Sequence, residues 1–206
     1  MGILFVILSI AIGVTAPPLP TTAADGAAVL EFYTAHRSGF MFGNFLGMLA
    51  LIPAIPMYTY TAYRIRLAEG AEGWLWLMSL FAGLIAHAVG MVDLAIYQVA
   101  SLQTTPELAK LANDLGAMCF AAIFPALTGC AWAVSIASLT VGGFGRWTGI
   151  SGVIVGLVCL VVSFGALWPD GVLAVPGPAT GGAFLLYIAW TSAMAAEIAW
   201  RPANRK

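Results

Sequence analysis

The chain has few charged side chains. Of its 206 residues only 8% are charged, against about a quarter in soluble domains. Eight Lys and Arg residues with a formal net charge of −1 cannot neutralise a phosphate backbone, which excludes a nucleic-acid partner. Hydrophobic residues make up 61% of the chain. This composition excludes a soluble enzyme and predicts a small polytopic membrane protein.

Histidine and cysteine are also scarce. Two histidines cannot supply the histidine-rich boxes of membrane di-iron oxygenases, and no serine elbow, zinc-binding histidine pair or phosphate loop occurs. The three cysteines, an odd number, all lie inside apolar runs, where they favour packing over a disulfide framework. We therefore expect a protein that is not an enzyme.

The apolar runs predict an all-α fold, a single membrane domain over 1–206 with six transmembrane helices. Short outer helices are expected at 23–36 and 106–114. The first span is only about 22 Å long at 1.5 Å per residue, and Val14-Thr15-Ala16 resembles a signal-peptide cleavage site. We expect it to be a retained helix, although the true start could also lie upstream. The six spans are predicted at 2–16, 38–62, 73–99, 115–140, 147–168 and 179–200.

The basic residues predict the orientation. With the N-terminus inside, the cytoplasmic segments hold six Lys or Arg residues and the outer segments hold only Arg37 and Lys110. This bias predicts a bacterial inner-membrane protein with both termini in the cytoplasm. Tyrosines at 58, 60 and 63 are expected at the inner membrane boundary. The six inner basic residues are Arg64, Arg66, Arg146, Arg201, Arg205 and Lys206.

The span at 38–62 has two unusual features. Gly39, Gly43 and Gly47 form a small-residue stripe that allows close approach of another helix, either within the chain or from a partner. Pro53 and Pro56 predict a kink, which either bends the bundle or lines a cavity.

Few polar side chains fall within the predicted spans. His87 and Asp93 are six residues apart, about 240° of helical rotation, so we expect them on different faces. Asp93 is expected at the interface, paired with Arg37 or Lys110, or alternatively as a proton or cation site. His87 is read as a hydrogen-bonded core residue rather than a ligand. Asn44 is expected to bond across helices.

No cofactor is predicted. A haem held by two histidines would need His36 and His87, which we expect at depths differing by about 15 Å. One histidine with Met48 or Met91 is the alternative for haem or copper.

Residues 31–37, 111–115 and 146–150 (EFYTAHR, LANDL and RWTGI) resemble a bacterial family. Its members are small six-helix inner-membrane proteins, common in actinobacteria and proteobacteria and catalogued as a domain of unknown function. The resemblance covers most of 25–168 and implies no activity. Its most distinctive polar feature corresponds here to four outer residues. They either cover the mouth of a cavity between the spans at 38–62, 73–99 and 115–140, or anchor an interfacial helix. These residues are Phe32, Tyr33, His36 and Arg37.

Three functions are compatible with the sequence. The first is an accessory or assembly subunit that contacts another membrane chain, or a second copy, through the span at 38–62. The second is a binder or carrier of a lipid or apolar small molecule in the cavity. The third is a proton- or ion-coupled transporter that uses Asp93 and His87. In each, the lipid bilayer is the surrounding partner.

Overall fold

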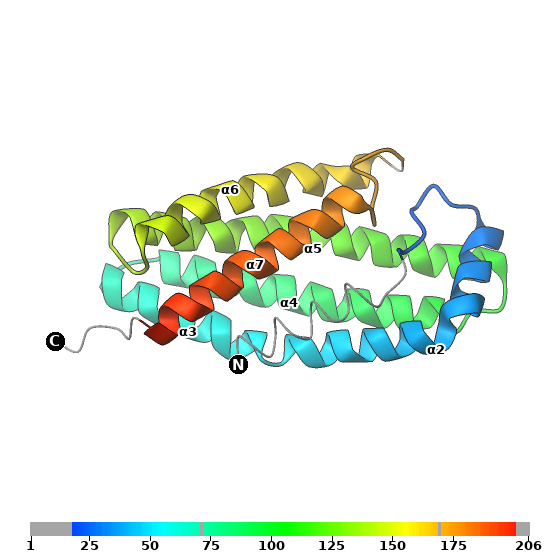
Figure 1. Cartoon of the computed structure of the whole chain (residues 1–206), viewed down its shortest axis with the longest axis horizontal. Coiled ribbons are helices and arrows are strands. Elements are labelled where there is room, and N and C mark those ends of the chain that lie inside the picture. Colours follow the sequence, from blue (N-terminus) through cyan, green and yellow to red (C-terminus); the bar gives the residue numbers. More distant parts are fainter. Residues whose placement is uncertain (1–17, 71, 169, 201–206) are drawn as a thin grey trace.

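The computed structural model describes residues 18–70, 72–168 and 170–200. Across these residues every regular element is a helix, which confirms the predicted all-α class. Figure 1 shows the long helices lying side by side as an elongated bundle. The elements are α2 (Gly26–Leu51), α3 (Ala54–Glu69), α4 (Leu75–Ala100), α5 (Pro106–Thr140), α6 (Arg146–Ser163), the short η1 (Phe164–Leu167) and α7 (Pro178–Trp200).

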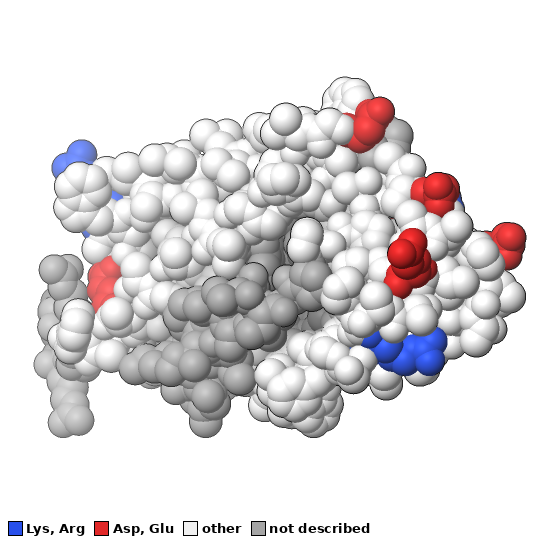
Figure 2. All heavy atoms as spheres, turned by 45° about the vertical axis from the view of Figure 1, so that its right-hand side comes forward, with Lys and Arg blue, Asp and Glu red and all other residues white. Residues whose placement is uncertain are grey.

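The surface of the bundle is suited to lipid. Within the described residues, five helical stretches are long and apolar enough to cross a membrane. Large apolar side chains point outward, among them Phe42 with 63% of its surface exposed and Phe81 with 58%. Figure 2 shows charged side chains toward the two ends of one face and an uncharged flank between them. The fold therefore fits a multi-pass membrane protein. The span predicted at 2–16 lies outside the described residues.

The span predicted at 38–62 is two helices rather than one. Proline has no backbone N–H, so Pro53 cannot donate to the carbonyl of Leu49. Ile52 N donates to that carbonyl instead, at 3.2 Å, which tightens the chain as α2 ends. The helix resumes at Ala54 as α3. The prolines therefore interrupt the helix only at Ile52 and Pro53, which both keep right-handed helical backbone angles, and Gly26–Glu69 remains one membrane-long stretch with an irregularity where the sequence predicted a kink.

The two short outer helices are not separate elements. The one predicted at 23–36 is the start of α2, which Asp25 caps by accepting a hydrogen bond from Ala28 N at 2.8 Å. These first turns bend away from the rest of α2 (Figure 1). The one predicted at 106–114 is continuous with the next span, since no residue there interrupts the helix.

Helix α5 is the centre of the bundle. Its 35 residues extend about 52 Å at 1.5 Å per residue, and it packs against α2, α3, α4 and α6. Its central side chains Phe124, Ala131 and Val134 are fully buried. The core therefore runs along α5. A cavity beside α5 can be lined by residues of several other helices as well.

Glycines on α6 allow it to lie close to α5. A Cβ atom at Gly152 would collide with the Ser135 side chain of α5 and with Trp190 of α7. A Cβ atom at Gly156 would collide with the indole of Trp132, also on α5. The two helices approach this closely because these positions carry no side chain.

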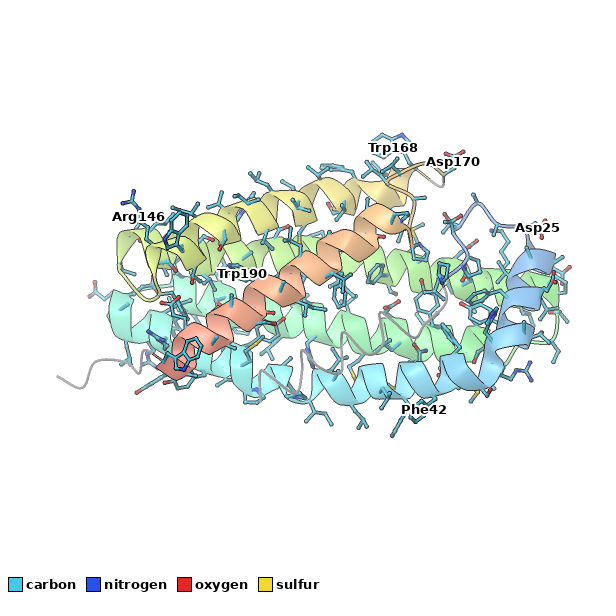
Figure 3. All side chains as sticks on the ribbon, viewed as in Figure 1. Asp25, Phe42, Arg146, Trp168, Asp170 and Trp190 are labelled. Carbon is cyan, nitrogen blue, oxygen red and sulfur yellow. The ribbon has the colours of Figure 1, made fainter. Side chains whose placement is uncertain are left out.

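A carboxylate from α7 holds the start of α6. Glu197 accepts hydrogen bonds from Gly145 N and from the Thr148 hydroxyl. Carboxylates stabilise the N-terminus of a helix because its first N–H groups have no partner within the helix. The contact therefore fixes α7 against the end of α6 where Arg146 lies (Figure 3).

Candidate functional site: a cavity at the break between α2 and α3

A cavity of about 160 Å³ lies at the place where α2 ends and α3 begins. Leu51, the last residue of α2, and Ala54, the first of α3, both line it. Helix α4 contributes one side, and Ile123 of α5 and Phe184 of α7 contribute to the rest. The walls are therefore mainly apolar, and they come from five helices.

Small residues leave this space open. Gly47, Ala50 and Ala86 line the cavity together with Gly90. A Cβ atom at Gly90 would lie 3.8 Å from Ile123 Cδ1 and 4.0 Å from Leu51 Cδ1, which are ordinary contact distances. The cavity thus exists because the residues that line it on α2 and α4 include glycines and alanines, whose side chains are too small to fill it.

Asp93 lines the cavity and is almost completely buried, with 5% of its surface exposed. Its Oδ1 atom is buried and has no hydrogen-bond partner among the described residues. By contrast, the buried hydroxyls of Ser135 and Ser138 both donate to carbonyls one turn earlier in their helix. Buried polar atoms are normally bonded, so a carboxyl group that borders a cavity and has an unpartnered oxygen indicates a place for a ligand group.

The predicted ion pairs of Asp93 are wrong. Lys110 pairs instead with Asp114, with 2.9 Å between Nζ and Oδ2, and also donates to Thr22 O. Arg37 is exposed on α2 and makes no ion pair with Asp93. The carboxyl group lies inside the bundle rather than at its surface, because the side of α4 that carries Asp93 packs inward.

Asn44 fixes α2 beside this carboxyl group. Its Nδ2 atom donates to Leu94 O on α4 at 2.9 Å, which confirms the predicted bond across helices. Leu94 follows Asp93 directly and also lines the cavity. The bond therefore holds two of the cavity's walls in register.

His87 borders the same cavity as Asp93, although the two residues lie on different faces of α4 as predicted. A rotation of about 240° one way is about 120° the other way, and a cavity shared by several helices spans that angle. The imidazole faces the backbone carbonyl of Leu51, at the end of α2. Along α4 the two residues are about 9 Å apart. The α4 wall of the cavity thus carries two separate polar side chains, Asp93 and His87.

Two tyrosines near His87 were not predicted as site residues. Tyr58 of α3 and Tyr187 of α7 both line the cavity, and their hydroxyl oxygens are 3.5 Å apart. The Tyr58 ring packs edge-on against His87, with 6.3 Å between ring centroids. Tyr58 was expected at the membrane boundary but is only 4% exposed. The sequence carries no signal for this pair, because the two residues are 129 positions apart.

The outer cluster predicted around 32–37 lies elsewhere. Tyr33 is buried, and its hydroxyl donates to Asn113 Oδ1 of α5 at 2.9 Å. His36 is exposed, and its Nδ1 atom bonds to Phe32 O within α2. Phe32, Tyr33, His36 and Arg37 do not line the cavity, so the structure does not bring the predicted lid and the cavity together. The contacts instead anchor the start of α2 to α5.

The glycine stripe of α2 is divided between two environments. Gly39 and Gly43 face open space, where an added Cβ would meet no atom within 4 Å. Gly47 is buried and lines the cavity. Packing against the described residues therefore does not explain the first two glycines.

No group of three His, Cys, Asp or Glu side chains within the described ranges is arranged to hold a metal ion. His36 lies apart from the cavity, so the structure does not bring the two histidines to one site. That the protein carries no haem or copper stays a prediction.

Comparison of the sequence with models of protein families, with curated proteins and with solved structures gives no match. The resemblance to a family of small inner-membrane proteins therefore stays a prediction.

Proposed function

We propose that this protein binds or carries a small apolar molecule in the cavity between α2, α3, α4, α5 and α7. One observation carries the proposal: an apolar cavity within a membrane bundle that contains a buried carboxyl group with an unpartnered oxygen. Ligand sites in proteins have this composition, in which apolar walls supply most of the contact and a few polar groups fix the orientation.

The volume sets the size of the ligand. An apolar cavity of about 150 Å³ holds one benzene ring. The cavity here, at about 160 Å³, therefore suits one ring or a short alkyl chain with a polar end. A whole lipid would have to extend out of this volume through the open side of the cavity, so of the two ligand classes expected from the sequence we favour the small molecule.

The membrane arrangement belongs to the same proposal. We place six helices in a bacterial inner membrane with both termini in the cytoplasm. Arg146 lies at one end of the bundle, and Asp25, Trp168 and Asp170 lie at the other (Figure 3). Arg146 thus lies at the end that the positive-inside rule assigns to the cytoplasm, apart from the acidic residues Asp25 and Asp170.

The proposal predicts that a neutral aromatic probe binds the full-length protein at one site. The probe is para-fluorobenzyl alcohol, which has one ring and one polar end, and fluorine NMR in lipid nanodiscs detects its binding. We expect saturable line broadening with a stoichiometry of about one per chain, in excess of that caused by empty nanodiscs. Broadening equal to that of empty nanodiscs would contradict the proposal.

An accessory subunit is the second candidate, and one observation favours it. Among the described residues no atom lies close to an added Cβ at Gly39 or Gly43, and the ring of Phe42 on the same helix is exposed, a surface that a partner helix would fit. Purification in fixed stoichiometry with a second chain would support this function. Coupling to protons or ions through Asp93 and His87 stays a prediction without an observation of its own.

A further inference from the structure

We propose that the ligand of this cavity carries a cationic amine, which pairs with the Asp93 carboxylate while its apolar body occupies the space beside Gly90. The inference rests on the proposed function and adds the chemical class of the ligand.

The first step is the state of the carboxyl group. Asp93 is 5% exposed, and its Oδ1 atom has no donor within the described part of the chain. A charge buried in an apolar interior is costly unless an opposite charge accompanies it. Inside a membrane bundle the same argument marks such residues as sites for a cation or a substrate. The missing element at Asp93 is therefore a donor that also brings positive charge.

The second step is that the neighbouring groups supply no such charge. Three titratable side chains near Asp93 are Tyr33, Tyr97 and Cys119, while His87 borders the same cavity about 9 Å away along α4. None of the first three becomes a cation. The hydroxyl of Tyr97 is itself buried without a hydrogen-bond partner. These three neighbours of Asp93 are thus neutral or, when ionised, negative, so they add no positive charge, which favours an incoming amine over an incoming acid.

The third step is the shape of the space. On the α4 wall of the cavity, Gly90 lies between Asp93 and His87, which are about 9 Å apart along the helix. Gly90 and Ile123 leave the middle of the cavity apolar. Beyond it lie the hydroxyls of Tyr58 and Tyr187. An amine at Asp93 therefore places a ring or short chain against apolar wall, with the tyrosine pair past its far end.

Three probes of one shape test the charge preference. They are para-fluorobenzylamine, para-fluorobenzyl alcohol and para-fluorophenylacetate, which at neutral pH are cationic, neutral and anionic. Fluorine NMR with the full chain in nanodiscs of uncharged lipid gives each dissociation constant. We expect the amine to bind about tenfold or more tightly than the alcohol, because hydrogen bonds between charged groups are about twice as strong as neutral ones. The anion should bind most weakly.

The Asp93→Asn variant removes the charge and keeps the shape. It should lose the preference for the amine, so that its dissociation constants for the amine and the alcohol become about equal. If the wild type binds alcohol and amine equally, or prefers the anion, the inference is wrong while the proposed function stands. If it binds none of the probes, the proposed function itself is wrong. The wild-type comparison is sufficient even if Asp93→Asn does not fold.

Discussion

Replacing Gly90 by leucine is expected to abolish binding of para-fluorobenzyl alcohol. A Cβ atom at this position meets Ile123 and Leu51 only at ordinary contact distances, so the backbone needs no adjustment. The remaining three carbons of the new side chain project toward the cavity and occupy volume that the ring would use. We expect the affinity to fall by about a hundredfold or more, measured by fluorine NMR, since a filled cavity must be overpacked to admit the probe.

Stability should change little in the same variant. Leucine is favoured over glycine in a helix by nearly 1 kcal/mol, which offsets part of any crowding. The matched control is Gly182→Leu on α7, where the glycine is exposed and an added Cβ meets no atom within 4 Å. This control should bind the probe as the wild type does. Undiminished binding by a folded Gly90→Leu protein would show that the probe binds somewhere else.

The second large effect concerns α6. Leucine at Gly152 or Gly156 is expected to lower the free energy of unfolding by about 3 kcal/mol, the upper range for overpacking a well-packed interior. The reason is geometric: a Cβ atom at Gly152 collides with Ser135 and Trp190, and one at Gly156 collides with Trp132. Neither position can accept a side chain unless α6 moves away from α5 or the side chains of Ser135, Trp190 or Trp132 change their positions. Thermal unfolding followed by tryptophan fluorescence in detergent measures the loss.

The control for these variants is Gly181→Leu, on α7. Its Cβ would meet no atom within 4 Å, so the same substitution adds surface without a collision. We expect an unfolding temperature close to that of the wild type. If Gly152→Leu and Gly156→Leu unfold at the wild-type temperature as well, the described packing of α5 against α6 is incorrect.

Local structure could be predicted from the sequence because its causes are local. Long apolar runs fix the helices, and α4 and α7 begin and end within about two residues of the predicted spans. Pro53 signalled an irregularity, since a missing N–H acts on its own helix. The merging of 106–114 with the next span was missed for a related reason. The sequence predicted a separate short helix there, yet no residue breaks the helix before the next span.

The cavity could not be predicted, because it depends on which helices meet. Asp93 and His87 were assigned to different faces from the geometry of one helix, whereas the cavity is lined by five. Tyr58 has the sequence position of a boundary residue and is buried beside Tyr187 through contacts made by other helices. Asn44 was predicted correctly because a buried amide in a membrane must find a partner, although its partner, Leu94, could not be named.

The most direct test of the cavity is a crystal of the full-length protein exposed to xenon under pressure. Xenon enters apolar cavities of about 150 Å³ and is located by its anomalous scattering. The account predicts a strong xenon site in contact with Gly90, Ile123 and Leu127, which line the cavity, and its disappearance in Gly90→Leu. Xenon sites confined to the lipid-facing surface, or none in the bundle, would contradict the account.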